Sequence, residues 1–259
     1  MGTFLFDQIV FGPVQSRRLG VSLGINLLPV NKKICTFNCL YCECGWTKSE
    51  IDKSSFHSSR EVKAALEEKL REMAEDNERP DAITFAGNGE PTLHPAFEEI
   101  MGDTLRLRDQ WCPSAEIAVL SNATMIGNPP VFRALLRADK NILKLDSGIQ
   151  ETINLINQPK VPYNLEETIQ SLTRFEGNMV IQTLFLRGSY HGQPIDNTTE
   201  KEIQAWIDAL NRIQPGELMI YTLSRETPAP DLETVSEEEL QKIAERVEQE
   251  LNIEVHVAA

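Results

Sequence analysis

The run Ala82-Ile-Thr-Phe85 and the turn Gly87-Asn-Gly-Glu-Pro91 contain the pattern that decides the fold. An apolar run of strand length leads into a glycine-rich turn. The stretch Pro95–Leu107 then carries apolar residues at helical spacing, and Glu116–Leu120 is the next apolar run. Strand, helix and strand in this order predict a parallel pair joined by a right-handed crossover.

The same unit recurs along the chain. The apolar runs that we expect to be strands are Leu23–Leu28, Ala82–Phe85, Glu116–Leu120, Asn141–Leu145, Met179–Leu186 and Leu218–Leu223. Capping-box patterns, in which Ser or Thr precedes Glu by three residues, predict helix starts at Ser58–Glu61, Thr199–Glu202 and Ser236–Glu239. Two further helices are expected at Pro130–Arg137 and Leu165–Leu172.

Six such units are fewer than the eight of a closed barrel. We therefore expect an α/β fold, a partial (β/α)6 TIM-like barrel with parallel strands and short terminal extensions; a doubly wound sheet is the alternative. No Pro/Gly/Ser-rich linker divides the chain, so residues 1–259 are interpreted as one domain. Its core covers about 20–225, and 226–259 add a helix and a possible edge strand at Ile253–Val257.

Composition limits the class of protein. The 259 residues are 41% hydrophobic and 25% charged, as in ordinary globular proteins. The apolar runs are of strand length, and the first residues lack a basic region followed by a long apolar run. We therefore expect a cytoplasmic protein with no membrane partner. The net charge of −14 disfavours nonspecific binding to phosphate backbones.

A cysteine-rich loop follows the first expected strand. Cys35-Thr-Phe-Asn-Cys39-Leu-Tyr-Cys42 has the spacing C-x3-C-x2-C, and four of the five cysteines lie between positions 35 and 44. Three thiolates hold three irons of a [4Fe–4S] cluster and leave the fourth iron open to another ligand. A zinc site with Cys44 as fourth ligand, or an inert group of cysteines, are the alternatives. We interpret Cys44 and Cys112 as non-ligands.

This loop, with the aromatic Tyr41 directly before the last cysteine, resembles the signature of the radical S-adenosylmethionine (SAM) superfamily. The resemblance implies a [4Fe–4S] cluster on Cys35, Cys39 and Cys42, with SAM chelated at the open iron. In that superfamily an electron from the reduced cluster cleaves SAM, and a 5′-deoxyadenosyl radical abstracts hydrogen from the substrate. A reducing electron donor of the flavodoxin or ferredoxin type is expected as a partner.

Polar and glycine residues at the other strand ends complete the expected SAM site. Gly87-Asn-Gly-Glu-Pro91 resembles the GGEP motif of the superfamily, with Asn88 in place of its first glycine. We expect Asn88 to be tolerated because asparagine enters the left-handed region readily. The residues expected to contact SAM or the substrate are Tyr41, Gly87, Asn88, Gly89, Glu90, Ser121, Asn122, Lys144, Asp146 and Arg187. No catalytic residue is assigned.

Two basic stretches flank the first expected strand. Arg17 and Arg18 precede it, and Lys32 and Lys33 lie beside the cysteine loop. Together they could neutralise an anionic substrate, or they could cap the barrel and lie on its surface.

Four segments together resemble a narrower group, the short radical SAM proteins related to wyosine synthases, which modify a guanosine of tRNA. They are GPVxSRRLGxSLGI, FAGNGEPTLHP, QTLFLRG and YTLSRETPAP. Residues 1–34 contain no cysteine for the second cluster of those enzymes, and the acidic charge disfavours tRNA. We therefore expect a single-cluster enzyme with an unidentified substrate. Wyosine-type tRNA modification, activation of a partner protein and a non-catalytic metal-binding module are the alternatives.

Overall fold

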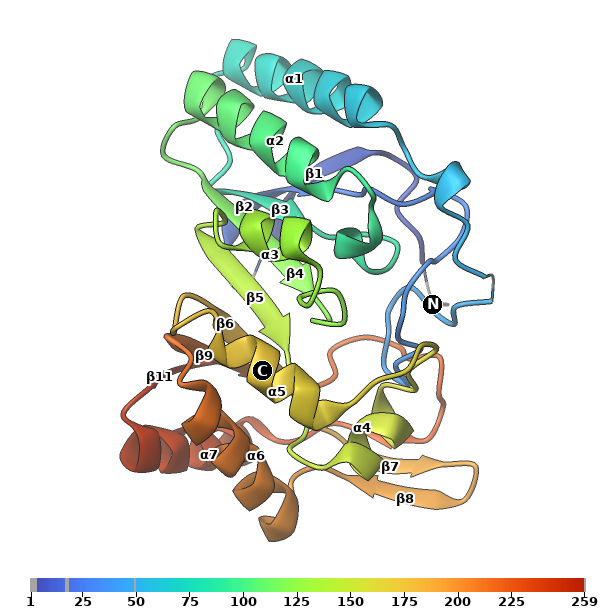
Figure 1. Ribbon diagram of the computed structural model, residues 1–259, viewed down its shortest axis with the longest axis vertical. Helices are drawn as coiled ribbons and strands as arrows, with labels where there is room; N and C mark the ends of the chain where they lie inside the picture. The colour runs from blue at the N-terminus through green and yellow to red at the C-terminus, as the bar shows by residue number, and fades with distance from the viewer. Residues whose placement is uncertain (1–3, 17–18, 49, 259) are drawn as a thin grey trace.

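The structure is a computed structural model that describes residues 4–16, 19–48 and 50–258. Strands and helices alternate along most of this chain (Figure 1). The strands are β1 (Val10–Ser16), β2 (Gly20–Ile25), β3 (Ala82–Phe85), β4 (Glu116–Ser121), β5 (Lys140–Lys144), β6 (Val180–Leu184), β7 (Arg187–Tyr190), β8 (Gln193–Asp196), β9 (Glu217–Tyr221), β10 (Leu232–Glu233) and β11 (Glu254–Ala258). The helices are α1 (Ser59–Glu75), α2 (Phe97–Trp111), α3 (Pro129–Leu135), α4 (Gln150–Ile156), α5 (Leu165–Thr173), α6 (Glu200–Ile213) and α7 (Glu237–Leu251), with 3-10 turns η1 (Lys53–Ser55) and η2 (Pro91–Leu93).

Eight strands form one sheet in the order β1-β2-β3-β4-β5-β6-β9-β11. All pairs from β2 to β11 are parallel, and β1 is antiparallel to β2. The strand order follows the chain without reversal, so right-handed crossovers place the connecting helices on one face. Figure 1 shows α1 to α3 over one half of the curled sheet and α5 to α7 over the other. The partial (β/α)6 barrel is confirmed, and the doubly wound alternative is wrong.

Alternation along the strands separates two apolar layers. Ile83 and Phe85 of β3 join the large core between sheet and helices. Thr84 lies on the concave face, where its hydroxyl is 2.8 Å from that of Ser22. This concave face also carries a small apolar cluster that includes Ile142 and Met219. Below the strand ends the interior narrows to a small hollow of about 150 Å³, lined by Ser22, Thr84 and Ile142 among others.

The capping boxes behave differently from one another. Those at α1 and α7 are complete, with Ser58 and Ser236 as the caps. At α6 Thr199 accepts the Glu202 N–H, but the buried Glu202 carboxylate instead accepts hydrogen bonds from Ser147 Oγ at 2.6 Å and Thr152 Oγ1 at 2.5 Å. The box expected at Thr199 is therefore half formed, because its glutamate ties α6 to the region around α4.

Some elements were not predicted. These are β1, the antiparallel β7–β8 hairpin with β10, and the short helix α4. The expected strand Met179–Leu186 ends at Leu184, and β7 begins at Arg187. Polar residues and a proline in β7 and β8 conceal the alternation that identifies strands. The expected edge strand at the C-terminal end is confirmed as β11, which pairs with β9.

None of the helices in the described part of the chain has the length and apolarity that a bilayer crossing requires.

Candidate active site

A cavity of about 340 Å³ lies at the carboxyl ends of the parallel strands. This volume is within the range of small-molecule sites, roughly 300–1,000 Å³. Its walls include Lys33, Cys35, Cys39, Tyr41, Cys42 and Cys44 from the loop after β2, Gly87, Gly89 and Glu90 after β3, Leu120 and Asn122 at the end of β4, Lys144 of β5, Gln182 and Leu184 of β6, and Tyr221 to Arg225 at the end of β9. Six strand ends therefore contribute to one cavity, as expected for this fold.

The cysteine loop is held from two sides. Ile34 forms a parallel bridge with Gly89, and Phe37 forms an antiparallel bridge with Pro159. The Leu40 N–H also donates to Ile156 O at 2.9 Å. Below the loop, its buried side chains pack in a small apolar cluster that includes Leu184. The three cysteines of the motif are thereby fixed on one wall of the cavity.

Two cysteine sulfurs are buried, and their environment favours the neutral thiol. Burial raises the pKa of Cys35 to about 12 and also raises the pKa of Cys39. The pKa of Cys42 is lowered, first by a hydrogen bond with the Cys44 side chain and then by the charge of Lys33. Iron must therefore displace protons from Cys35 and Cys39 when it binds.

Lys33 supplies a buried positive charge beside these sulfurs. Burial opposes its charge, but the neighbouring cysteine sulfurs, Cys42 foremost, prevail and raise the pKa of Lys33. Its ammonium donates to Gly45 O at 2.7 Å. The sequence placed Lys33 beside the loop, and the structure brings it into the cavity wall. Arg17 and Arg18, expected to act with it, lie outside the described residues.

The two glycines of the Gly87-Asn-Gly-Glu-Pro91 turn have positive φ, +134° at Gly87 and +135° at Gly89. A Cβ at Gly89 would lie 1.8 Å from the Ile34 carbonyl oxygen. Glycine is therefore required at Gly89 by the packing of the turn against the cysteine loop. Both glycines line the cavity, as expected.

Asn88 differs from the expectation. Asn88 is not among the described residues that have a positive φ. The expectation that it is tolerated because it adopts the left-handed region is therefore wrong. Its buried amide bonds the backbone of Phe6 in both directions at 2.8 Å and donates to Pro29 O at 2.9 Å. Asn88 therefore binds the N-terminal segment, and it is Phe4 and Phe6 of that segment that line the cavity.

Glu90 organises the loop after β4. Its buried carboxylate accepts hydrogen bonds from Ser121 Oγ at 2.8 Å, the Asn122 N–H at 2.6 Å and Thr92 Oγ1 at 2.5 Å. Burial raises the pKa of Glu90, and these donors oppose the shift. The Ser121 hydroxyl is bound to Glu90 and lies beneath the cavity wall, whereas Asn122 forms part of the wall.

Tyr41, Lys144 and Asp146 form one buried cluster. The Lys144 ammonium donates to Tyr41 Oη at 2.7 Å and lies 3.5 Å from Asp146 Oδ2. Tyr41 donates a short hydrogen bond to the same carboxylate oxygen. Burial opposes the charge of Lys144, but Asp146 and Tyr221 raise its pKa. Tyr41 and Lys144 face the cavity, while Asp146 supports them from behind.

Arg187 is not brought to the cavity. Its guanidinium bonds the Glu239 carboxylate at 2.7 and 3.1 Å and Thr198 Oγ1 at 2.6 Å. It also pairs with Asp196 at 3.3 Å. These contacts tie the β7–β8 hairpin to the start of α7. The expectation that Arg187 contacts SAM or substrate is corrected: the chain turns away after β6, and the side chain points to this ion pair.

Sequence reasoning missed Asn157, which follows α4. Its side chain is fully buried, and its Nδ2 lies 3.3 Å from Cys39 Sγ and 2.7 Å from Asp146 Oδ2. The spacing of Ile149, Ile153 and Ile156 was the available signal for a short helix that ends at an asparagine.

The three motif cysteines match the donor type of an iron–sulfur cluster, which is held by cysteine thiolates. Across the described parts of the chain, no three His, Cys, Asp or Glu side chains are placed to hold one metal ion. Cysteines that bind a cubane each bind a different iron, so their sulfurs lie farther apart than the ligands of one zinc. Cys35, Cys39 and Cys42 border the same open space, and Cys44, whose Sγ lies 3.4 Å from Gly87 O, borders it as well.

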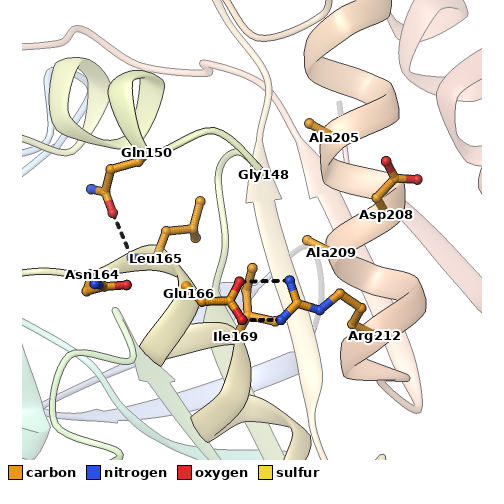
Figure 2. Close-up of a pocket in the computed structure, with 10 residues that line it drawn as sticks. All are labelled: Gly148, Gln150, Asn164, Leu165, Glu166, Ile169, Ala205, Asp208, Ala209 and Arg212. Atoms are coloured by element: carbon orange, nitrogen blue, oxygen red, sulfur yellow. Dashed lines mark hydrogen bonds and ion pairs between the residues drawn. The ribbon is translucent and has the colours of Figure 1, made fainter.

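A second hollow, of about 450 Å³, lies between α5 and α6 in the outer helical layer (Figure 2). An ion pair spans it, with Arg212 Nη1 2.8 Å from Glu166 Oε2. Gln150 Oε1 accepts the Leu165 N–H at 2.7 Å. These contacts join neighbouring elements, so the hollow is a groove of helix packing that lies apart from the cysteines.

No protein-family model matches the chain. A UPF0026 protein of Synechocystis, slr1464, is 33% identical over 85% of this chain and 77% of its own length. The chain belongs to the UPF0026 family. The UPF0026 protein MJ1312 of Methanocaldococcus jannaschii is 30% identical over 83% of this chain. A Brachyspira hyodysenteriae protein named GTPase Obg is 30% identical over 96% of it. This UPF0026 chain spans 63% and 35% of those two relatives, respectively.

Solved structures of other proteins share the fold. A radical SAM methyltransferase from Sphaerobacter thermophilus superposes with a TM-score of 0.65 over 92% of the UPF0026 chain and 65% of its own, at 17% identity. Streptococcus suis SuiB bound to S-adenosylmethionine superposes with a TM-score of 0.62 over 91% of the UPF0026 chain and 50% of its own, at 14% identity. Archaeal TYW1 superposes with a TM-score of 0.53 over 88% of the UPF0026 chain and 71% of its own, at 12% identity. At these identities the likeness establishes the half-barrel fold.

Proposed function

We propose that this UPF0026 protein is a radical SAM enzyme that binds one [4Fe–4S] cluster on Cys35, Cys39 and Cys42 and SAM in the adjoining cavity. The observation that supports this most strongly is the convergence of three motif cysteines and the glycine-rich turn on one cavity at the strand ends. Three protein ligands leave a coordination position for SAM. When bound, the cluster would supply one electron for cleavage of SAM to a 5′-deoxyadenosyl radical, which abstracts hydrogen from a substrate.

The residues around the cavity have distinct parts in this proposal. Gly87 and Gly89 offer backbone groups to the SAM amino group, and the Lys144 ammonium faces the cavity as a partner for a carboxylate. Leu120 and Leu184 provide apolar surface for the adenine ring. Asn88, Ser121 and Asp146 act through the neighbours that they hold, and Arg187 has no part in the site.

The mouth of the cavity is partly closed by the N-terminal segment. Phe4 N–H donates to Glu43 O at 3.1 Å, and Arg225 Nη1 lies 2.7 Å from Glu43 Oε2. The Arg225 guanidinium also lies over the Phe4 ring, 5.6 Å from its centroid. This group of contacts limits access of water to the reacting centre, which a radical intermediate requires.

The partner that we propose is an electron donor of the flavodoxin or ferredoxin type, since the cysteine pattern of the chain provides no second cluster as a reductant. The substrate is proposed to enter beside Arg225, where the cavity shares Leu223, Ser224 and Thr227 with an open groove. A gel shift with tRNA at several salt concentrations separates a small substrate from the wyosine-type alternative.

Anaerobic reconstitution tests the proposal. We expect about four iron and four sulfide per chain and release of 5′-deoxyadenosine from SAM after reduction. Cys39→Ala is expected to lose both, because one of three ligands is removed. Cys44→Ala and Cys112→Ala are matched controls that should retain iron. One bound zinc without SAM cleavage, or cleavage that persists in Cys39→Ala, would contradict the assignment.

A further inference from the structure

Two buried cysteine sulfurs accept hydrogen bonds from asparagine side chains outside the cysteine loop. Asn122 Nδ2 lies 3.4 Å from Cys35 Sγ, and Asn157 Nδ2 lies 3.3 Å from Cys39 Sγ. Asn122 follows β4, whereas Asn157 caps the C-terminal end of α4. Separate parts of the chain thus direct one donor each to a different sulfur.

The neighbours of each amide determine which end faces sulfur. Asn122 Oδ1 accepts the Thr124 N–H at 3.0 Å and Thr124 Oγ1 at 2.7 Å, so its NH₂ group is left toward Cys35. Asn157 Nδ2 donates to Asp146 Oδ2 at 2.7 Å. The same Asp146 oxygen also accepts the Tyr41 hydroxyl, so it acts as an acceptor and the NH₂ end of Asn157 must face Asp146 and Cys39. The hydrogen-bond partners of each asparagine amide therefore determine which end of the amide faces the sulfur.

The third sulfur has a positive charge nearby. Lys33 is almost fully buried, and its charge helps to lower the pKa of Cys42. The carboxylates of Glu90 and Asp146 are the negative groups near the sulfurs. Donors already surround both: Asp146, for example, also accepts the Leu184 N–H at 3.0 Å. Their effect on the sulfurs is therefore reduced relative to that of free carboxylates.

One-electron reduction adds a negative charge to an iron–sulfur cluster, and part of it resides on the sulfur atoms. Hydrogen bonds to the sulfurs therefore stabilise the reduced form more than the oxidised form. Given the cluster of the proposed function, we propose that Asn122 and Asn157 are positioning residues that raise its reduction potential through N–H···S hydrogen bonds to Cys35 and Cys39. The electron itself comes from the external donor named above.

A redox titration of the reconstituted protein, followed by the electron paramagnetic resonance signal of the reduced cluster, tests the proposal. In Asn157→Leu and in Asn122→Leu we expect about a tenfold lower ratio of reduced to oxidised cluster at a fixed solution potential. For a one-electron couple this corresponds to a potential about 59 mV lower. An unchanged potential in both variants would overturn the proposal.

Asn141→Leu is the matched control. Asn141 is a buried asparagine of β5 whose side-chain nitrogen and oxygen have no hydrogen-bond partner within the described ranges. The same substitution there removes a buried amide but no N–H···S bond. We expect the potential of Asn141→Leu to equal that of the unmodified protein, and a fall as large as in Asn157→Leu would contradict the specific role of the two donors.

A measurement on the unmodified protein decides the matter even if a leucine variant fails to fold. Protein labelled with ¹⁵N only at asparagine side-chain nitrogens should show hyperfine coupling between ¹⁵N and the reduced cluster. Absence of this coupling would refute the N–H···S bonds while leaving the proposed function intact. Failure of the unmodified protein to assemble a cluster would refute the proposed function itself.

Discussion

A side chain near the cavity is available to a ligand only if neighbouring residues do not already bind its polar atoms. Asn88 and Glu90 are adjacent to the glycines of the turn, yet the Asn88 amide binds Phe6 and the Glu90 carboxylate binds the loop after β4. Arg187 ends up in an ion pair with Glu239. Sequence motifs identify the residue types of a site, but only the packing of neighbouring loops determines which side chains remain available to a ligand.

The Arg187–Glu239 pair gives a prediction about pH. The hydrogen bond from Arg187 is the main cause that lowers the pKa of Glu239 to about 2, against roughly 4.3 in an unfolded chain. Because the folded value is depressed, the pair stabilises the fold fully above about pH 4.3, and this contribution is lost as the pH falls through about 2. Both side chains are partly exposed, so Arg187→Met should lower the free energy of unfolding at neutral pH by less than about 1 kcal/mol.

Denaturant unfolding of the metal-free chain between pH 7 and pH 2 measures this. The difference in the free energy of unfolding between the unmodified chain and Arg187→Met should shrink as the pH falls toward 2. In a Glu239→Gln background the effect of Arg187→Met should depend less on pH. A difference that stays constant down to pH 2 in the unmodified background would contradict the pairing.

At the scale of elements, the site is assembled by segments that brace one another. The turn after β3 holds the cysteine loop through the Ile34–Gly89 bridge, and the end of α4 holds its other side. The N-terminal segment is bound by Asn88, and Phe6 stacks on Phe11 with ring centroids 3.7 Å apart. The cavity wall therefore depends on contacts between loops that are far apart in sequence.

Asn88→Gly, which restores the glycine of the GGEP motif, should release the N-terminal segment. The substitution removes the acceptor of the Phe6 N–H and two donors to backbone carbonyls, each contributing about 1 kcal/mol. We expect faster amide hydrogen exchange in residues 4–8 with iron content unchanged. Hydrogen-exchange mass spectrometry provides the measurement.

Asn77→Gly is the control for this experiment. Asn77 is exposed, has a φ of +59° and follows α1. The change should leave exchange in residues 4–8 as it is. If Asn88→Gly also leaves that exchange unaltered, the amide of Asn88 does not hold the segment.

The sequence predicted the elements with strong periodicity and missed those defined by contacts. The apolar runs around Ile83 and Ile142 identified strands because consecutive residues there are apolar and buried. The β7–β8 hairpin was missed because its partly exposed, polar residues lack that pattern. Asn157 was missed because its role depends on α4 folding back onto the cysteine loop, which no local spacing reveals.

At the scale of the whole molecule, one sheet gathers the site. Parallel strands in chain order place all the strand ends on one rim, so a loop at position 35 meets residues from positions 90, 122, 144 and 221. The cavity therefore arises from topology, while its chemistry arises from the cysteine loop. The net charge of −14 remains compatible with a buried anionic cluster because Lys33 and Lys144 supply local positive charge.

The central claim is that three cysteines leave one iron of a [4Fe–4S] cluster open to SAM. Electron–nuclear double resonance on the reduced, reconstituted protein tests it most directly when SAM carries ¹⁵N in its amino group and ¹⁷O in its carboxylate. The account predicts hyperfine coupling of both nuclei to the cluster. A cluster that assembles but shows coupling to neither nucleus at saturating SAM would contradict it.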